Sequence, residues 1–146
     1  MAFASISAVL DSMAARIEAL SPSSQDAADD VFRVSIRPAT DSVGSRAVHL
    51  AAQAGIRKPG SNRLCKVWES QVEVIAYYTD QPTEAGRSTV YQRALTDAED
   101  ILADLYTWSS TTDGIDRIDP SPGDVLADGQ GEIIATRTIQ IEYQRT

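Results

Sequence analysis

Residue types that often carry chemistry are scarce in this chain. His49 is the only histidine and Cys65 the only cysteine, so one chain cannot supply the usual four ligands of a structural zinc site. His49 lies among apolar residues without a catalytic signature, which favours a structural role over that of a general base. Lys66 next to Cys65 would favour the thiolate, but the apparent strand around them indicates a small core residue. Since Walker and GxGxxG motifs are also missing, we expect neither an enzyme nor a bound cofactor.

Three carboxylates at intervals of three resemble a metal site at first reading: Asp113, Asp116 and Asp119. Calcium loops place acidic oxygens at every second residue and end on a carboxylate at position twelve. On a strand or a turn, a spacing of three does not bring the carboxylates to one ion without a further chain reversal. We therefore expect no bound metal. A small hydrolase that uses these carboxylates with a divalent metal remains an alternative.

Charged residues are separated along the chain into a basic and an acidic segment. The net charge of −8 disfavours sequence-independent binding of DNA or of anionic membranes. Residues 42–68 hold no acidic residue, and residues 95–132 hold ten acidic residues against Arg117 alone. The basic residues of the first segment are Arg46, Arg57, Lys58, Arg63 and Lys66.

Both charged segments are compatible with solvated faces. The alternative is that the basic segment of one copy contacts the acidic segment of the next, which suits head-to-tail assembly. The candidate contact residues for a subunit or partner interface are Arg46, Arg57, Lys58, Arg63, Lys66, Asp113, Asp116 and Asp119.

Two amphipathic helices are expected to support these segments. Apolar residues recur at three- and four-residue steps over residues 2–20 and again, as a broad stripe, over residues 87–108. On the second helix, Asp97, Asp100 and Asp104 fall together opposite the apolar stripe, where we expect a solvated face. An export signal and a membrane span are not expected, because no basic leader and no run of about 18 apolar residues is present.

Alternating apolar and polar residues predict four strands, over residues 31–37, 64–79, 115–118 and 132–144. The strand over residues 64–79 is apolar on both faces, so a central position is expected for it. Residues 39–62 are predicted to form a long projecting loop, within which residues 46–54 could form a short helix. Residues 120–131, rich in Pro and Gly, are predicted to form a flexible hairpin-like connection. Together these elements predict one α+β domain over residues 1–146, a small mixed or antiparallel sheet packed by two helices.

Three segments carry a resemblance to a known family: VEVIAYY at 72–78, the helix YQRALTDAEDILADL at 91–105 and the terminal ATRTIQIEY at 135–143. In order and pattern the chain from residue 31 onward resembles the tail terminators of tailed bacteriophages, also called tail completion proteins, the lambda U-like group. The resemblance implies a virion protein whose copies form a ring, commonly a hexamer, on the head-proximal end of the tail tube. Such a ring stops tube polymerisation and joins the tail to the head through the neck.

The partners that the resemblance implies are further copies of the chain, the tail tube protein and a neck or head–tail connector protein. Assembly would take place in the host cytoplasm, without a membrane partner. The long loop over residues 39–62 would contact neighbouring subunits or the tube. DNA would pass through the lumen without specific binding, because a negatively charged wall opposes adsorption of phosphates.

Other functions remain open besides the hydrolase. A stopper or another neck protein also forms rings from small subunits, but it would bind the portal side instead of the tube. An acidic adaptor would dock one partner through the same basic residues. Reversing those charges would then remove the partner without changing the oligomeric state.

Overall fold

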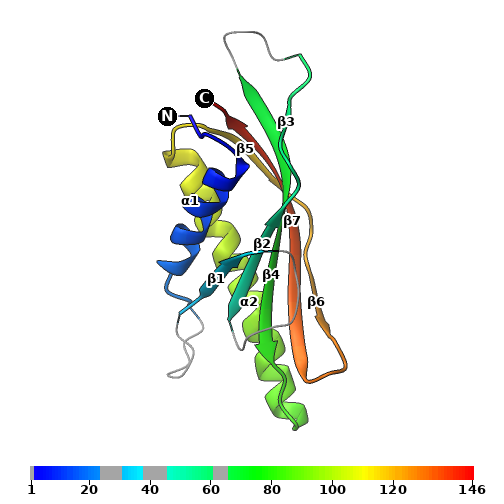
Figure 1. Cartoon of the computed structure of the whole chain (residues 1–146). Coiled ribbons are helices and arrows are strands. Elements are labelled where there is room, and N and C mark those ends of the chain that lie inside the picture. Colours follow the sequence, from blue (N-terminus) through cyan, green and yellow to red (C-terminus); the bar gives the residue numbers. More distant parts are fainter. Residues whose placement is uncertain (1, 24–30, 38–45, 61–65) are drawn as a thin grey trace.

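A mixed sheet with helices on one face forms the molecule (Figure 1). The computed structural model describes residues 2–23, 31–37, 46–60 and 66–146, and within them the sheet has seven strands and is covered by two helices. The predicted α+β class is therefore confirmed. No helix in these ranges is long and apolar enough to cross a bilayer.

Both predicted helices are present, with shifted ends. Helix α1 spans Ile6–Glu18 and begins where the Ser5 hydroxyl accepts a hydrogen bond from the amide of Ala8 at 3.3 Å. Helix α2 spans Glu84–Thr111, and the Thr83 hydroxyl caps it by accepting from the amide of Gly86 at 3.0 Å. Helix α2 thus begins before its apolar stripe, because the capping residue, and not the apolar stripe, determines where the first turn of the helix begins.

The sheet is organised around two long antiparallel strands. Its strands are β1 (Arg33–Ile36), β2 (Ala47–Ala52), β3 (Ile56–Arg57), β4 (Val67–Thr79), β5 (Ile115–Pro120), β6 (Asp124–Ala127) and β7 (Glu132–Gln144). Their order is β1-β2-β4-β7-β5, while β3 pairs with β4 and β6 pairs with β7. Strands β4 and β7 pair along all 13 residues of each, so the sheet is about 40 Å long. The predicted central position of β4 is confirmed, since it lies between β2 and β7.

The short helix predicted over residues 46–54 is wrong, because this segment forms strand β2. Val48 and Leu50 point into the core and pair with Ala76 and Val74 of β4. The predicted loop over residues 39–62 is likewise interrupted by β2 and β3, and residues 39–45 and 61–62 lie outside the described residues. A short apolar run fits a helix or a strand equally well, and pairing with a long neighbouring strand decides between them here.

A further strand, β6, lies inside the predicted connection over residues 120–131. It pairs with the first half of β7 and forms a hairpin with it. The Asp128 carboxylate holds the turn by accepting from the amides of Gln130 at 2.7 Å and Glu132 at 3.0 Å. This strand has only four residues and is flanked by Pro- and Gly-rich segments, so its alternation of apolar and polar residues is too short to predict it.

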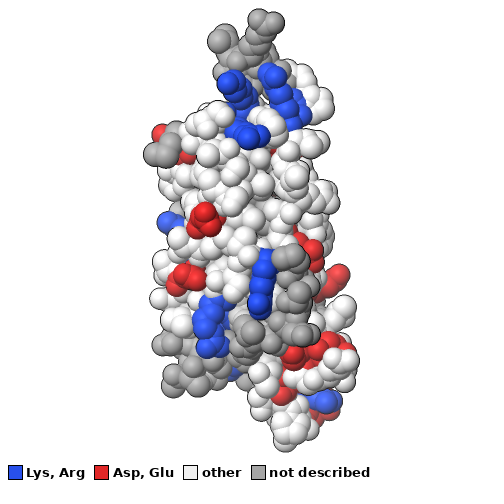
Figure 2. Space-filling view, in the orientation of Figure 1, with Lys and Arg blue, Asp and Glu red and all other residues white. Residues whose placement is uncertain are grey.

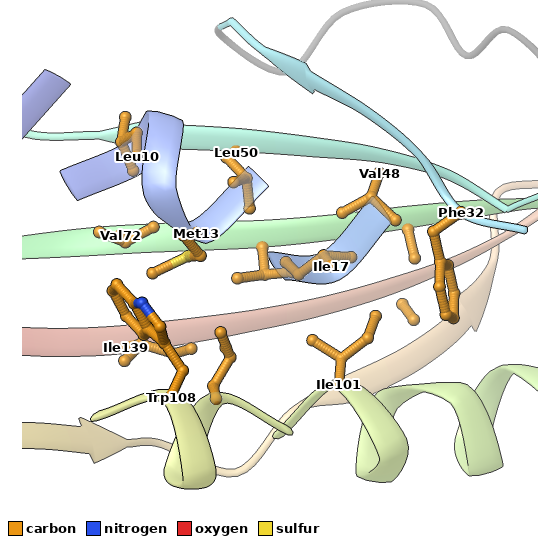
Figure 3. Close-up of a cluster of buried hydrophobic side chains, with 14 of the residues drawn as sticks. Leu10, Met13, Ile17, Phe32, Val48, Leu50, Val72, Ile101, Trp108 and Ile139 are labelled. Carbon is orange, nitrogen blue, oxygen red and sulfur yellow. The ribbon is translucent and has the colours of Figure 1, made fainter. Parts of the chain in front are cut away.

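The core lies between the helices and the sheet face that they cover (Figure 3). From α1, Met13 and Ile17 are fully buried, and from α2 the indole of Trp108 lies close to Ile139 of β7. One face of β7 is buried in this core, and the half-buried Arg137 interrupts its row of apolar side chains.

Candidate assembly surface

Arg46 was expected at an exposed interface, but it is fully buried, so this prediction is wrong. Its guanidinium donates to the carboxylate of Asp97 twice, from Nε to Oδ2 at 2.8 Å and from Nη2 to Oδ1 at 3.2 Å. The Tyr78 hydroxyl donates to the same Oδ2 at 2.8 Å. The backbone amide of Arg46 also bonds the carbonyl of Tyr77, and this directs the start of β2 along β4.

The cluster of Arg46, Asp97 and Tyr78 joins the residue before β2 to α2 and β4 below the surface. Burial, followed by the charge of Asp97, raises the pKa of the Tyr78 hydroxyl far above its ordinary value, so the hydroxyl stays a donor. Buried charges are tolerated only when they are paired and hydrogen-bonded, and here each partner meets that condition. The cluster therefore stabilises the fold and is not part of a contact surface.

The acidic residues of α2 do not form the solvated face that was predicted. Asp97 is buried, and Asp104 receives two hydrogen bonds from Arg16 Nε of α1, at 3.1 and 3.0 Å. Asp100 accepts from the amide and the hydroxyl of Ser23 at 3.0 and 2.6 Å. Helical spacing correctly placed the three carboxylates together, but it could not reveal that α1 and the sheet lie against them.

Basic residues, two of them exposed and two half-buried, gather at one end of the sheet, where β3 pairs with the start of β4. We call Arg57, Lys58, Lys66 and Arg145 the basic tip; Figure 2 shows basic side chains together at this end. Lys58 Nζ pairs with Glu142 at 2.8 Å, and the Arg145 guanidinium lies 4.4 Å from the ring centroid of Trp68. Arg63 belongs to a segment outside the described residues. Three of the five basic residues predicted for contacts therefore meet at the basic tip.

Gly55 allows the chain between β2 and the basic tip to pass close to the Tyr143 side chain. A side chain at this position would collide with the buried hydroxyl of Tyr143 and would come close to Trp68. The backbone therefore passes directly over β7, and β3 can pair with the start of β4.

Asp116 and Asp119 lie on the edge strand β5, Asp113 lies just before it, and all three are exposed. Asp116 accepts from Gln144 Nε2 at 2.9 Å, and Asp119 pairs with Arg117 at 3.3 Å. Asp116 falls where the pairing of β5 with β7 shifts register. Within the described ranges, no group of three or more His, Cys, Asp or Glu side chains is arranged to hold a metal ion, so the structure does not assemble these carboxylates into a site.

The opposite end of the sheet carries a groove that the sequence did not reveal. It has a volume of about 770 Å³ and lies between the start of α2 and the β6–β7 hairpin. We call it the acidic groove; it is lined by Asp80, Gln81, Pro82, Glu84, Arg87, Ser88, Tyr91, Val125, Leu126, Ala127, Gly129, Gly131 and Ile133. Its two contributing elements are far apart in the sequence, and the one signal was the apolar Val125-Leu126 pair between acidic residues.

Both charge and apolar surface are exposed at the acidic groove. Asp80 is paired with Arg87 at 3.5 Å, while Glu84 lies exposed at the start of α2. Tyr91 is 44% exposed and Leu126 is 66% exposed. The adjoining hairpin adds the carboxylates of Asp124, Asp128 and Glu132. This end of the molecule therefore presents carboxylates around exposed apolar side chains, which is typical of a contact surface.

His49 lies in β2 and is fully buried. Arg37 Nη2 donates to its Nε2 at 2.9 Å, and the Tyr77 ring lies 4.9 Å away between centroids. Burial, together with the charge of Arg37, lowers the pKa of His49 below its ordinary value. The neutral ring is therefore the form that fits the fold.

Acid is expected to destabilise the fold through His49. Below pH 6.5, the unfolded chain binds a proton on the His49 side chain more readily than the folded chain does. The free energy of unfolding therefore decreases as the pH falls, by up to about 1.4 kcal/mol for each pH unit. Urea unfolding at pH 8, 6 and 5 of the wild type and of His49→Gln measures this, because glutamine can still accept from Arg37 but does not titrate. Identical pH profiles for the two proteins would contradict the prediction.

Comparison with known proteins identifies no family. No family model matches the chain, and no curated protein matches it at a significant level. Its function must therefore be inferred from its residues and from the arrangement of its elements.

Proposed function

We propose that this chain is the subunit of a tail terminator of a tailed bacteriophage. Its copies form a homo-oligomeric ring, with six as the expected number, on the head-proximal end of the tail tube. The ring stops tube polymerisation and joins the tail to a neck or head–tail connector protein. The observation that carries this proposal is the opposite charge of the two ends of one elongated sheet, the basic tip and the acidic groove.

Complementary patches at opposite ends of a subunit favour head-to-tail contacts, and such contacts form a closed ring when the rotation between neighbours closes. Electrostatic complementarity also selects the correct neighbour and speeds the encounter. The α+β class supports the same proposal, because the family resemblance implies a small α+β subunit.

The role that we propose is structural and not enzymatic. Among the described residues, the first candidates for catalysis are His49 and the carboxylates near β5. His49 is buried and hydrogen-bonded to Arg37, and the carboxylates are not gathered into a metal site. The net charge of −8 supports a ring through which DNA passes without adsorbing. The place of action is thus the virion tail, after assembly in the host cytoplasm.

The native mass of the purified protein, measured by multi-angle light scattering with and without tail tube protein, tests this function. We expect a discrete ring, alone or on addition of the tube protein, that weakens as salt is raised because the contacts are charged. A monomer that ignores the tube protein at every salt concentration would contradict the proposal. A ring that binds a portal-side protein but not the tube protein would identify a stopper instead.

A further inference from the structure

The acidic groove and the basic tip fit each other as the two halves of one subunit contact. We propose that the basic tip of one copy docks into the acidic groove of the next copy, and that this contact builds the ring. The inference rests on the proposed self-assembly, and it specifies which residues form the interface.

Charge complementarity is the first argument. Arg57 and Lys66 are exposed at the basic tip, and Glu84 is exposed at the rim of the acidic groove. Docking places these cations opposite the carboxylate of Glu84 and those of the β6–β7 hairpin. In the reverse arrangement, two basic tips or two acidic grooves would repel each other, so the charges select a head-to-tail contact.

Apolar surface is the second argument. Ile56 of β3 is 59% exposed at the basic tip, and in the acidic groove Leu126 is 66% exposed and Tyr91 44% exposed. Removing such side chains from water stabilises a contact, and aromatic residues are enriched where interfaces are strongest. The groove volume of about 770 Å³ accommodates several side chains of the tip.

The position of the two surfaces excludes an intramolecular contact. Strand β4 begins at Val67, next to the basic tip, and ends at Thr79, directly before the first residues that line the acidic groove. The two surfaces are therefore separated by about 40 Å of sheet within one molecule. A tip can thus reach only the groove of another copy.

Edge-to-edge pairing of sheets is the main competing mode of self-assembly, and several features of strand β5 discourage it. This strand has a register shift after Ile115, carries the Arg117–Asp119 pair and ends at Pro120. A shifted register, charged side chains and proline all discourage an edge strand from pairing with another chain. Pairing through this edge of the sheet is therefore disfavoured.

Two charge-reversal variants test the contact. The tip variant carries Arg57→Glu and Lys66→Glu, and the groove variant carries Glu84→Lys and Ser88→Lys. We expect each to raise the protein concentration needed for assembly by about 100-fold or more, because like charges then face each other. The control carries Ser7→Lys and Asp11→Lys on α1. Like the groove variant, it replaces one serine and one acidic residue, four positions apart and exposed on a helix, by lysine. It should assemble like the wild type.

Mixing the two variants gives the decisive result. The reversed tip of one variant matches the reversed groove of the other, and the two unchanged surfaces match as well. We therefore expect equal amounts of both variants to recover a ring of the wild-type mass, in which the two alternate. Circular dichroism of each variant alone confirms that loss of assembly is not loss of folding.

Distinct outcomes separate this inference from the proposed function. If the wild type forms a ring but either variant alone assembles equally well, or the mixture fails to assemble, the interface is overturned while the ring stands. If the groove variant keeps the ring and loses only the tube protein, the groove holds that protein and not a second copy. A wild type that never assembles, with or without tube protein, overturns both.

Discussion

Replacing Asp97 by alanine is expected to lower the free energy of unfolding by about 3–5 kcal/mol. The carboxylate holds the guanidinium of Arg46 and the hydroxyl of Tyr78, and all three groups are buried. Without it, the charge of Arg46 stays in the core with its main partner removed. Denaturant unfolding at neutral pH measures the loss.

Two further variants separate the buried charge from general effects of truncation. Tyr78→Phe removes one hydrogen bond to a charged group and should cost about 1.5–3 kcal/mol. Arg16→Ala breaks the ion pair with Asp104, whose arginine is 40% exposed, and should cost about 1 kcal/mol or less. If Asp97→Ala were as mild as Arg16→Ala, the account of the buried cluster would be wrong.

Replacing Trp108 by alanine is expected to cost about 3–5 kcal/mol, through a cavity between the helices and the sheet. The indole is 3% exposed, lies beside Met13 and Ile139, and donates from Nε1 to the Ser12 hydroxyl at 3.3 Å (Figure 3). Its loss would therefore loosen α1 as well as α2. Thermal unfolding followed by circular dichroism gives the measurement.

Trp108→Phe is the matched control, because it keeps most of the apolar volume and loses the bond to Ser12. A cost clearly below that of the alanine variant is expected. Equal costs for the two variants would mean that the hydrogen bond, and not the packing, accounts for the stability at this position.

Long elements were predictable from the sequence because their patterns extend over many residues. The alternation over residues 132–144 matches the bounds of β7, and the stripe over residues 87–108 lies within α2. Strand β2 was mistaken for a short helix because four consecutive residues, Ala47–Leu50, are buried and leave no alternation to read. Both faces of β2 are covered by other parts of the fold, and the sequence of the strand alone does not show this.

The contact surface was predictable only in part. Clustering of cations in the sequence correctly indicated Arg57, Lys58 and Lys66, which share one exposed end of the fold. The same clustering misplaced Arg46, because the partner that buries it, Asp97, lies on a helix 51 residues later. The acidic groove depends on α2 and β6 meeting in space, and local patterns contain no information on such a meeting.

Addition of the purified protein to growing tail tubes, followed by electron microscopy, tests the proposed function most directly. A terminator should arrest elongation and leave a ring at one end of each tube, while the tip variant should do neither at the same concentration. Tubes that grow to the same lengths with and without the protein, and that carry no ring, would contradict the account.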